Sequence, residues 1–176
     1  MGYWLASRWR RLIQNPSVIL APLVSEGMIV LEPGPGMGAF TLELARRVGP
    51  KGRVIAVDIQ PKMLEVLVRR ASKAGLAGWI EARQPKGDHL GVEDFQGRVD
   101  FALAFAMVHE VPKPELLFGD IRAALKGGGK LLLAEPCGHV KAKAFEATMD
   151  LARKSGFVLE SRPAIRWNHS ALLTRA

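Results

Sequence analysis

Short runs of apolar residues alternate along this chain with stretches in which apolar residues recur at helical spacing. The apolar runs cover residues 28–32, 53–57, 79–82, 101–105 and 130–134. The helical stretches cover 39–48, 61–75, 114–126 and 141–154. This order is typical of a parallel sheet whose connecting helices lie on both faces.

Two further strands are predicted at 157–160 and 170–174, each after a turn or a break. Their close spacing favours an antiparallel hairpin over another helical crossover. The expected fold is therefore Rossmann-like and doubly wound, with a mostly parallel seven-stranded sheet that a C-terminal hairpin completes. We expect Gly127-Gly128-Gly129 to end a helix and form the turn before the fifth strand.

The first 25 residues differ from the rest, because they combine aromatic and basic residues and contain no acidic residue. We predict a helical cap segment at 1–25 in front of a single domain at 26–176. A substrate lid and a membrane-surface contact are the alternatives for this segment. Within it, Asn15 before Pro16 is a helix N-cap followed by proline at the first helical position.

Composition excludes several classes of protein. The chain has 176 residues, of which 48% are hydrophobic and 24% charged, as in an ordinary globular domain. Its single cysteine cannot form an internal disulfide, and no apolar stretch approaches the roughly 20 residues of a spanning helix. No secretory signal is recognisable, so a cytoplasmic protein is expected. The net charge of +8 raises the question of an RNA substrate.

A glycine-rich turn lies between the first predicted strand and the first long helix. It contains Glu32, Gly34, Pro35, Gly36 and Gly38. Glycine permits positive φ and lets a ligand approach the backbone closely. Ligands of open α/β sheets bind at the carboxyl ends of the strands, so this turn is the expected site of a nucleotide-containing cofactor.

Two cofactors fit this turn. Gly34-x-Gly36-x-x-Ala39 satisfies a dinucleotide fingerprint, and Asp58 follows Gly38 by 20 residues, so an NAD-binding oxidoreductase stays open. Against it, the carboxylate of Glu32 would repel a pyrophosphate. It suits a ligand with an ammonium and a sulfonium group, which is S-adenosylmethionine. The only tyrosine is Tyr3, so a Tyr-x-x-x-Lys catalytic pair is absent.

Four segments in order resemble the motifs of the class I S-adenosylmethionine-dependent methyltransferases: 30–38, 54–64, 99–111 and 125–136. The third is similar to the small-molecule, ubiquinone-biosynthesis-type branch. The resemblance spans about residues 28–136. It implies that the cofactor is bound by Glu32, Gly34, Pro35, Gly36, Gly38, Asp58, Ile59, Met63, Asp88 and Phe105.

Within that set, the resemblance gives each position a role. The glycine turn lies along the methionine part of the cofactor, Asp58 takes the ribose hydroxyls, and Ile59 and Met63 pack on the adenine. Asp88 matches an adenine-contacting acid by its spacing from Asp100, although its surroundings depart from the usual pattern. Phe105 approaches the cofactor through its backbone.

The catalytic residue is left open. His109 is the one candidate for a base that removes an acceptor proton, against a purely structural histidine. Cys137 and His139 lack the usual zinc spacing, so no metal is expected.

The predicted function is methyl transfer to a small-molecule acceptor, which would enter near His109, Glu135, His139 and Trp167. The alternatives are a tRNA or rRNA methyltransferase, the oxidoreductase, and a cofactor-binding subunit without catalysis. A homodimer is left open.

Overall fold

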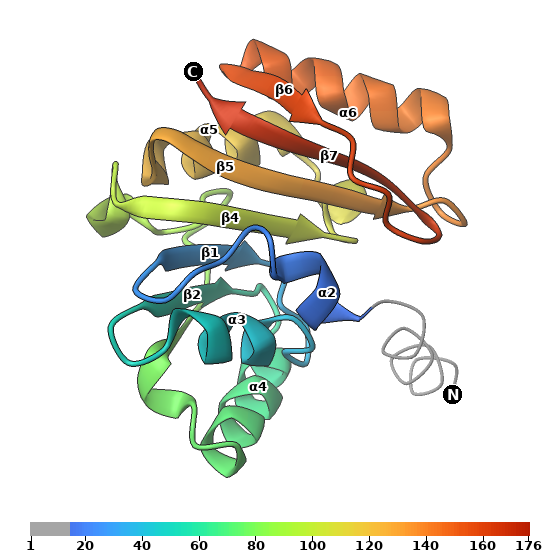
Figure 1. Cartoon of the computed structure of the whole chain (residues 1–176). Helices are drawn as coiled ribbons and strands as arrows, with labels where there is room; N and C mark the ends of the chain where they lie inside the picture. The colour runs from blue at the N-terminus through green and yellow to red at the C-terminus, as the bar shows by residue number, and fades with distance from the viewer. Residues whose placement is uncertain (1–14) are drawn as a thin grey trace.

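The computed structural model describes residues 15–176, and within them lies a seven-stranded sheet in the order β3-β2-β1-β4-β5-β7-β6 (Figure 1). The first five strands of the chain pair in parallel, while β7 pairs antiparallel with both β5 and β6. The sheet confirms the predicted fold class and the C-terminal hairpin. The strands are β1 (Ile29–Pro33), β2 (Arg53–Val57), β3 (Ile80–Arg83), β4 (Val99–Phe105), β5 (Leu125–Pro136), β6 (Phe157–Ser161) and β7 (Asn168–Arg175).

Helices cover both faces of this sheet. Alternate strand residues divide between two cores because successive side chains point to opposite faces. Val30, Phe101 and Leu132 belong to the core under α2 and α3, whereas Leu31, Ala102 and Leu131 belong to the core under α5 and α6. The helices are α2 (Pro16–Leu20), α3 (Thr41–Val48), α4 (Pro61–Lys73), α5 (Pro114–Ala124) and α6 (Ala142–Lys154), with short 3-10 turns at η1 (Ala77–Trp79), η2 (Glu93–Phe95) and η3 (Val108–Glu110).

The predicted N-terminal cap segment is only partly described, since residues 1–14 lie outside the described part of the chain. In the described part, the Asn15 side chain accepts a hydrogen bond from Ser17 N at 3.0 Å, which confirms the predicted N-cap. Leu20 is completely buried in the core under α3. Arg47 of α3 donates to the Ser17 carbonyl at 2.7 Å, so α2 is attached by both apolar and polar contacts.

The prediction for the glycine triplet was wrong. Helix α5 ends at Ala124, and residues 125–129 belong to β5. Leu125 is completely buried and pairs with Val99, whereas the next pair joins Phe101 to Lys130. The glycines therefore form an irregularity inside the strand rather than a separate turn, because burial of Leu125 draws the chain into the sheet before them.

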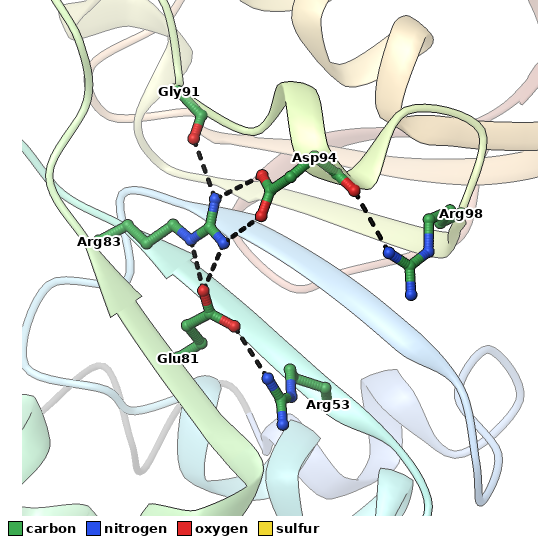
Figure 2. A network of polar contacts seen from close by, with 6 residues as sticks. All are labelled: Arg53, Glu81, Arg83, Gly91, Asp94 and Arg98. Atoms are coloured by element: carbon green, nitrogen blue, oxygen red, sulfur yellow. Dashed lines mark hydrogen bonds and ion pairs between the residues drawn. The ribbon is translucent and has the colours of Figure 1, made fainter.

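A network of charged side chains fastens the chain between β3 and β4 to the edge of the sheet (Figure 2). Arg83 donates two hydrogen bonds to Asp94, at 2.7 and 2.6 Å, and a third to the Gly91 carbonyl at 3.1 Å. It also contacts Glu81, which pairs with Arg53. The hydrogen bonds from the Arg83 guanidinium lower the pKa of Asp94. The segment between Arg83 and Asp94, which contains Asp88, is thus held by hydrogen bonds at both of its ends.

Among residues 15–176, no helix is both long and apolar enough to cross a membrane.

Candidate active site

The glycine turn follows β1 at the carboxyl edge of the sheet, beside the ends of β2 and β4. Gly34 N donates to the Val57 carbonyl at 2.8 Å, which ties the turn to β2. A Cβ at Gly34 would lie 2.9 Å from Met107 Cβ, and a Cβ at Gly38 would overlap Leu67 Cδ1. A Cβ at Gly36 would meet no atom within 4 Å. Two glycines are thus required by packing, while Gly36 borders open space in which a ligand can approach the backbone.

Asp58 follows β2 and holds the turn in place. Its Oδ2 accepts a hydrogen bond from Gly36 N at 3.2 Å, and its Oδ1 accepts one from Gln60 N at 2.9 Å. A carboxylate has about four lone-pair positions, so each oxygen can still accept a hydroxyl proton. The side chain is almost buried. Its geometry suits a vicinal diol, with both oxygens fixed by backbone donors.

Glu32 is the second carboxylate beneath the turn. Only 4% of the residue is exposed, and burial raises its pKa to about 8. The negative charge of Asp58 adds to this rise. Neither Glu32 Oε2 nor Thr41 Oγ1 has a hydrogen-bond partner. Buried polar atoms in a folded protein normally have partners, so these two are ready to bind a ligand donor, and an ammonium group fits them.

Apolar side chains border the turn on both sides. Phe105 at the end of β4 packs against Phe40, with ring centroids 4.4 Å apart and an angle of 31° between the planes. Ile59, next to Asp58, is 75% exposed, and Met63 on α4 is partly buried. The Pro35 carbonyl accepts a hydrogen bond from Gly38 N at 3.0 Å within the turn. An exposed isoleucine directly beside Asp58 is a suitable surface for a purine ring.

Asp88 lies apart from these groups on an exposed turn that a bridge between Lys86 and His89 closes. Its Oδ2 pairs with Lys113 Nζ at 2.5 Å, and this pairing lowers its pKa. Contact with an adenine amine would require that carboxylate to share or exchange its lysine partner. Its role as a cofactor ligand therefore stays a prediction.

His109 lies at the carboxyl end of β4, in η3. Its Nδ1 is in hydrogen-bond contact with Oε2 of Glu135 near the end of β5. The other Glu135 oxygen accepts a hydrogen bond from Val108 N at 2.7 Å, and only 1% of Glu135 is exposed. The ring of His139 stacks on that of His109 at 6.1 Å, with an angle of 10° between the planes. The two predicted rim residues His109 and Glu135 thus form a hydrogen-bonded pair.

Two residues beside this pair have unusual backbone angles. Ala106 and Trp167 have φ values of 54° and 60°, and they are the only non-glycine residues with positive φ in 15–176. Ala106 N donates to the Ala134 carbonyl, and Cys137 N donates to the Trp167 carbonyl. Trp167 is 64% exposed. Strained backbone concentrates at functional sites, and here it lies at the ends of β4, β5 and β7.

Two residues of this site do not stand out in the sequence as functional partners. Thr41 is one, although its position at the start of the helix after Gly38 is a usable signal. Glu135 is predicted at the rim, but nothing in the sequence links it to His109, which lies 26 residues away. Within 15–176, no group of three or more His, Cys, Asp or Glu side chains is placed to hold a metal ion.

The observed donors and acceptors fit S-adenosylmethionine. Glu32 and Thr41 offer unpartnered oxygens to an ammonium group, Asp58 offers a carboxylate to a ribose, and Gly36 leaves room along the backbone. A pyrophosphate has no donor to offer these oxygens, and the Asp58 carboxylate would repel it.

Comparison with known proteins agrees with this fit. A family model described as a methyltransferase domain matches residues 24–167. A ubiquinone/menaquinone biosynthesis C-methyltransferase UbiE of Pseudomonas putida strain W619 is 34% identical over 128 residues, covering 70% of this chain and 49% of that protein. The UbiE of Idiomarina loihiensis is 32% identical over 135 residues, covering 77% and 51%. The chain thus spans about half the length of these curated relatives.

Solved structures share the fold. A SAM-dependent methyltransferase from Aquifex aeolicus superposes with a TM-score of 0.83 at 21% identity, covering 95% of this chain and 93% of that one. A SAM-dependent O-methyltransferase from Thermotoga maritima gives 0.73 at 22% identity, covering 92% and 64%. At such identities the likeness concerns the fold. Together with the family match over residues 24–167, it shows that the chain belongs to the class I S-adenosylmethionine-dependent methyltransferases.

Proposed function

We propose that this chain transfers the methyl group of S-adenosylmethionine to a small-molecule acceptor. The observation that carries the proposal is the pair of buried carboxylates, Glu32 and Asp58, on either side of the open backbone at Gly36. Glu32 with Thr41 binds the ammonium group. Asp58 binds the ribose hydroxyls, and Ile59 and Met63 pack on the adenine.

Four further residues of the predicted set shape the turn in which the cofactor binds. Gly34, Pro35 and Gly38 shape the turn by the contacts described above, and Phe105 closes it from β4 through its packing against Phe40. When bound, S-adenosylmethionine supplies an activated methyl group that needs positioning more than chemical activation. The protein therefore has to bind two molecules in line and exclude water.

A small acceptor is supported by two observations. The curated relatives are named for methylation in ubiquinone and menaquinone biosynthesis, and the likeness to them covers 70–79% of this chain. The rim beyond the cofactor turn also offers aromatic and imidazole side chains, namely Trp167, His109 and His139. The net charge of +8 is the observation that keeps an RNA acceptor as the second candidate.

The test is a thermal-shift comparison with S-adenosylhomocysteine, with NAD and without ligand. A ligand at about 100 times its dissociation constant adds about 2.7 kcal/mol to the free energy of unfolding. For a chain of this length that corresponds to a rise of roughly 5–11 °C in Tm. We expect this rise with S-adenosylhomocysteine and none with NAD. A rise in Tm with NAD alone would contradict the proposal and favour an NAD-binding oxidoreductase.

Binding by itself does not separate an enzyme from a cofactor-binding subunit. The same protein is therefore incubated with labelled S-adenosylmethionine and a panel of small acceptors. Label in a small product supports the proposal. Tight binding with no transfer to any acceptor favours the non-catalytic subunit.

A further inference from the structure

We propose that Glu135 and His109 form a proton-accepting pair, in which Glu135 fixes the tautomer of His109 so that Nε2 removes a proton from the acceptor. This inference rests on the proposed methyl transfer and deepens it, because it names the class of acceptor. The acceptor attacks through an atom that carries a proton, such as a hydroxyl or thiol group or an acidic carbon.

Both oxygens of Glu135 are engaged, and this decides where the proton of His109 lies. Oε1 accepts from Val108 N at 2.7 Å, and Oε2 contacts His109 Nδ1. An ionised carboxylate only accepts hydrogen bonds, so Nδ1 must carry the proton. A neutral imidazole has one N–H and one lone pair, and the lone pair is then on Nε2.

The second ring nitrogen of His109 has different surroundings. The side chain of His109 is 27% exposed, whereas that of Glu135 is 2% exposed. Nε2 lies 3.8 Å from Oε1 of Glu110, which exceeds a hydrogen-bond distance, and the Glu110 side chain is 76% exposed. The ring of His139 lies nearly parallel to that of His109, with the centroids 6.1 Å apart. Among the described residues, Nε2 is therefore the ring nitrogen that no hydrogen bond occupies.

The pair lies beside the cofactor turn. Met107, two residues before His109, packs against Gly34 so closely that a Cβ added to this glycine would lie 2.9 Å from Met107 Cβ. The strained Ala106 between β4 and Met107 turns the chain toward Ala134 of β5. The segment 106–109 thus links the turn that binds the cofactor to the strand that contains Glu135.

The chemistry balances without another reactant. The acceptor gives its proton to Nε2, and its freed electron pair forms the new bond to the methyl carbon. The bond between that carbon and sulfur breaks with its electrons left on sulfur. The resulting imidazolium is paired with the Glu135 carboxylate and later loses its proton to water. Glu135 acts through His109, so it is a positioning residue.

Replacement of Glu135 by glutamine makes a sharp test, because an amide has only one acceptor oxygen for two partners. If the amide oxygen keeps Val108 N, the amide NH2 faces His109 Nδ1 and donates to it. His109 must then move its proton to Nε2, where it can no longer accept one from the acceptor. Glu135→Gln should therefore reverse the tautomer while the fold is retained.

The tautomer is read from the 15N chemical shifts of the His109 ring in two-bond 1H–15N spectra, at a pH where the ring is neutral. The chain has four histidines, and the His109→Gln variant identifies the signals of His109. We expect the Nδ1–H form in the unmodified protein and in Glu110→Gln, the matched control on the neighbouring carboxylate. We expect the Nε2–H form in Glu135→Gln. An Nε2–H form in the unmodified protein overturns the proposal, and the variant serves there only to assign the signals.

The acceptor class is tested with two fused-ring probes of similar size. 1-Naphthol carries a proton on its nucleophilic atom, whereas quinoline presents a nitrogen lone pair without one. We expect transfer to 1-naphthol to fall roughly 100-fold or more in His109→Gln and in Glu135→Gln. Methyl transfer to quinoline alone, or methyl transfer to 1-naphthol that survives both substitutions, overturns the proposed class of acceptor.

Failure of this inference differs from failure of the proposed function. S-adenosylhomocysteine binding is measured on the same samples by the thermal shift. A protein that binds no S-adenosylhomocysteine contradicts the proposed function, whatever the tautomer. If Glu135→Gln binds S-adenosylhomocysteine with unchanged affinity, but His109 does not adopt the expected tautomers, only the inference is contradicted.

Discussion

Individual carboxylates decide what this site can bind, and they do so by different physical means. Asp58 is held ready by two backbone donors, whereas Glu32 is buried beside Asp58 with an unpartnered oxygen. The backbone donors keep Asp58 oriented to accept hydrogen bonds from hydroxyl groups. The buried Glu32 destabilises the protein until a ligand provides a hydrogen-bond donor or a positive charge.

Asp58→Ala should weaken binding of S-adenosylhomocysteine by about 1.5–3 kcal/mol, the contribution of hydrogen bonds to a charged group. Calorimetric titration measures this change. Asp150→Ala, which removes an exposed carboxylate on α6, is the control and should leave the affinity unchanged. Equal affinities in Asp58→Ala and the unmodified protein would remove Asp58 from the cofactor site. A parallel unfolding measurement separates this effect from loosening of the turn that Asp58 holds.

Glu32 should make the stability of the ligand-free protein depend on pH. Burial raises the pKa of Glu32 from 4.5 to about 8, so the folded state binds the extra proton between these values. Stability from this group is present below about pH 4.5 and is lost as the pH rises to about 8, at about 1.4 kcal/mol per pH unit. Glu32→Gln removes the titrating group and should flatten this part of the curve.

The measurement is denaturant unfolding of both proteins from about pH 5 to about pH 9, a range that spans the raised pKa of Glu32. We expect the difference curve to favour Glu32→Gln increasingly toward high pH, although the same substitution weakens cofactor binding. In the unmodified protein, binding of the ammonium group should strengthen as the pH approaches 8, because ionised Glu32 is the form that attracts it. Parallel stability curves would show that Glu32 does not titrate in this range.

At the scale of elements, the glycine turn combines two requirements at neighbouring positions. Gly36 has a φ of 53° and faces open space, while Gly38 has a φ of 81° and contacts Leu67 of α4. Gly36 therefore leaves room for the ligand, whereas Gly38 allows the turn to pack against α4. Substitution by alanine distinguishes them, because both carry the same kind of backbone strain.

Gly36→Ala should cost about 1–2 kcal/mol of stability from strain and weaken S-adenosylhomocysteine binding at least tenfold. Gly38→Ala should cost about 1–3 kcal/mol more, because its Cβ overlaps Leu67. Thermal unfolding and calorimetric titration of the two variants provide both numbers. If Gly36→Ala binds as well as the unmodified protein, the open space beside Gly36 is not where the cofactor lies.

At the scale of the whole molecule, the net charge of +8 attracts any polyanion at low salt. We expect no saturable complex with a labelled single-stranded RNA at physiological salt, because the proposed acceptor is small. A saturable complex whose logarithmic affinity falls with a slope near about −0.7 per neutralised phosphate would favour the RNA methyltransferase instead. Fluorescence anisotropy across a salt series provides the slope.

The sequence by itself determined the fold class, the closing hairpin and the identity of the glycine turn. Apolar runs and helical spacing are local properties, and glycines at set positions after a strand indicate the backbone conformation that they must adopt. Glu32, Gly34, Gly36, Gly38 and Asp58 could be proposed as cofactor ligands for the same reason, since each lies within a few residues of a strand end.

Only the tertiary structure decided which distant groups meet. Glu135 and His109 touch because β5 lies beside β4 in parallel register, and the buried end of β5 brings a carboxylate to the imidazole. The orphaned oxygens of Glu32 and Thr41, the lysine partner of Asp88, and the entry of Leu125 into the sheet are likewise set by burial and long-range pairing. Burial and pairing depend on contacts between residues far apart in the chain, and local sequence patterns carry no record of them.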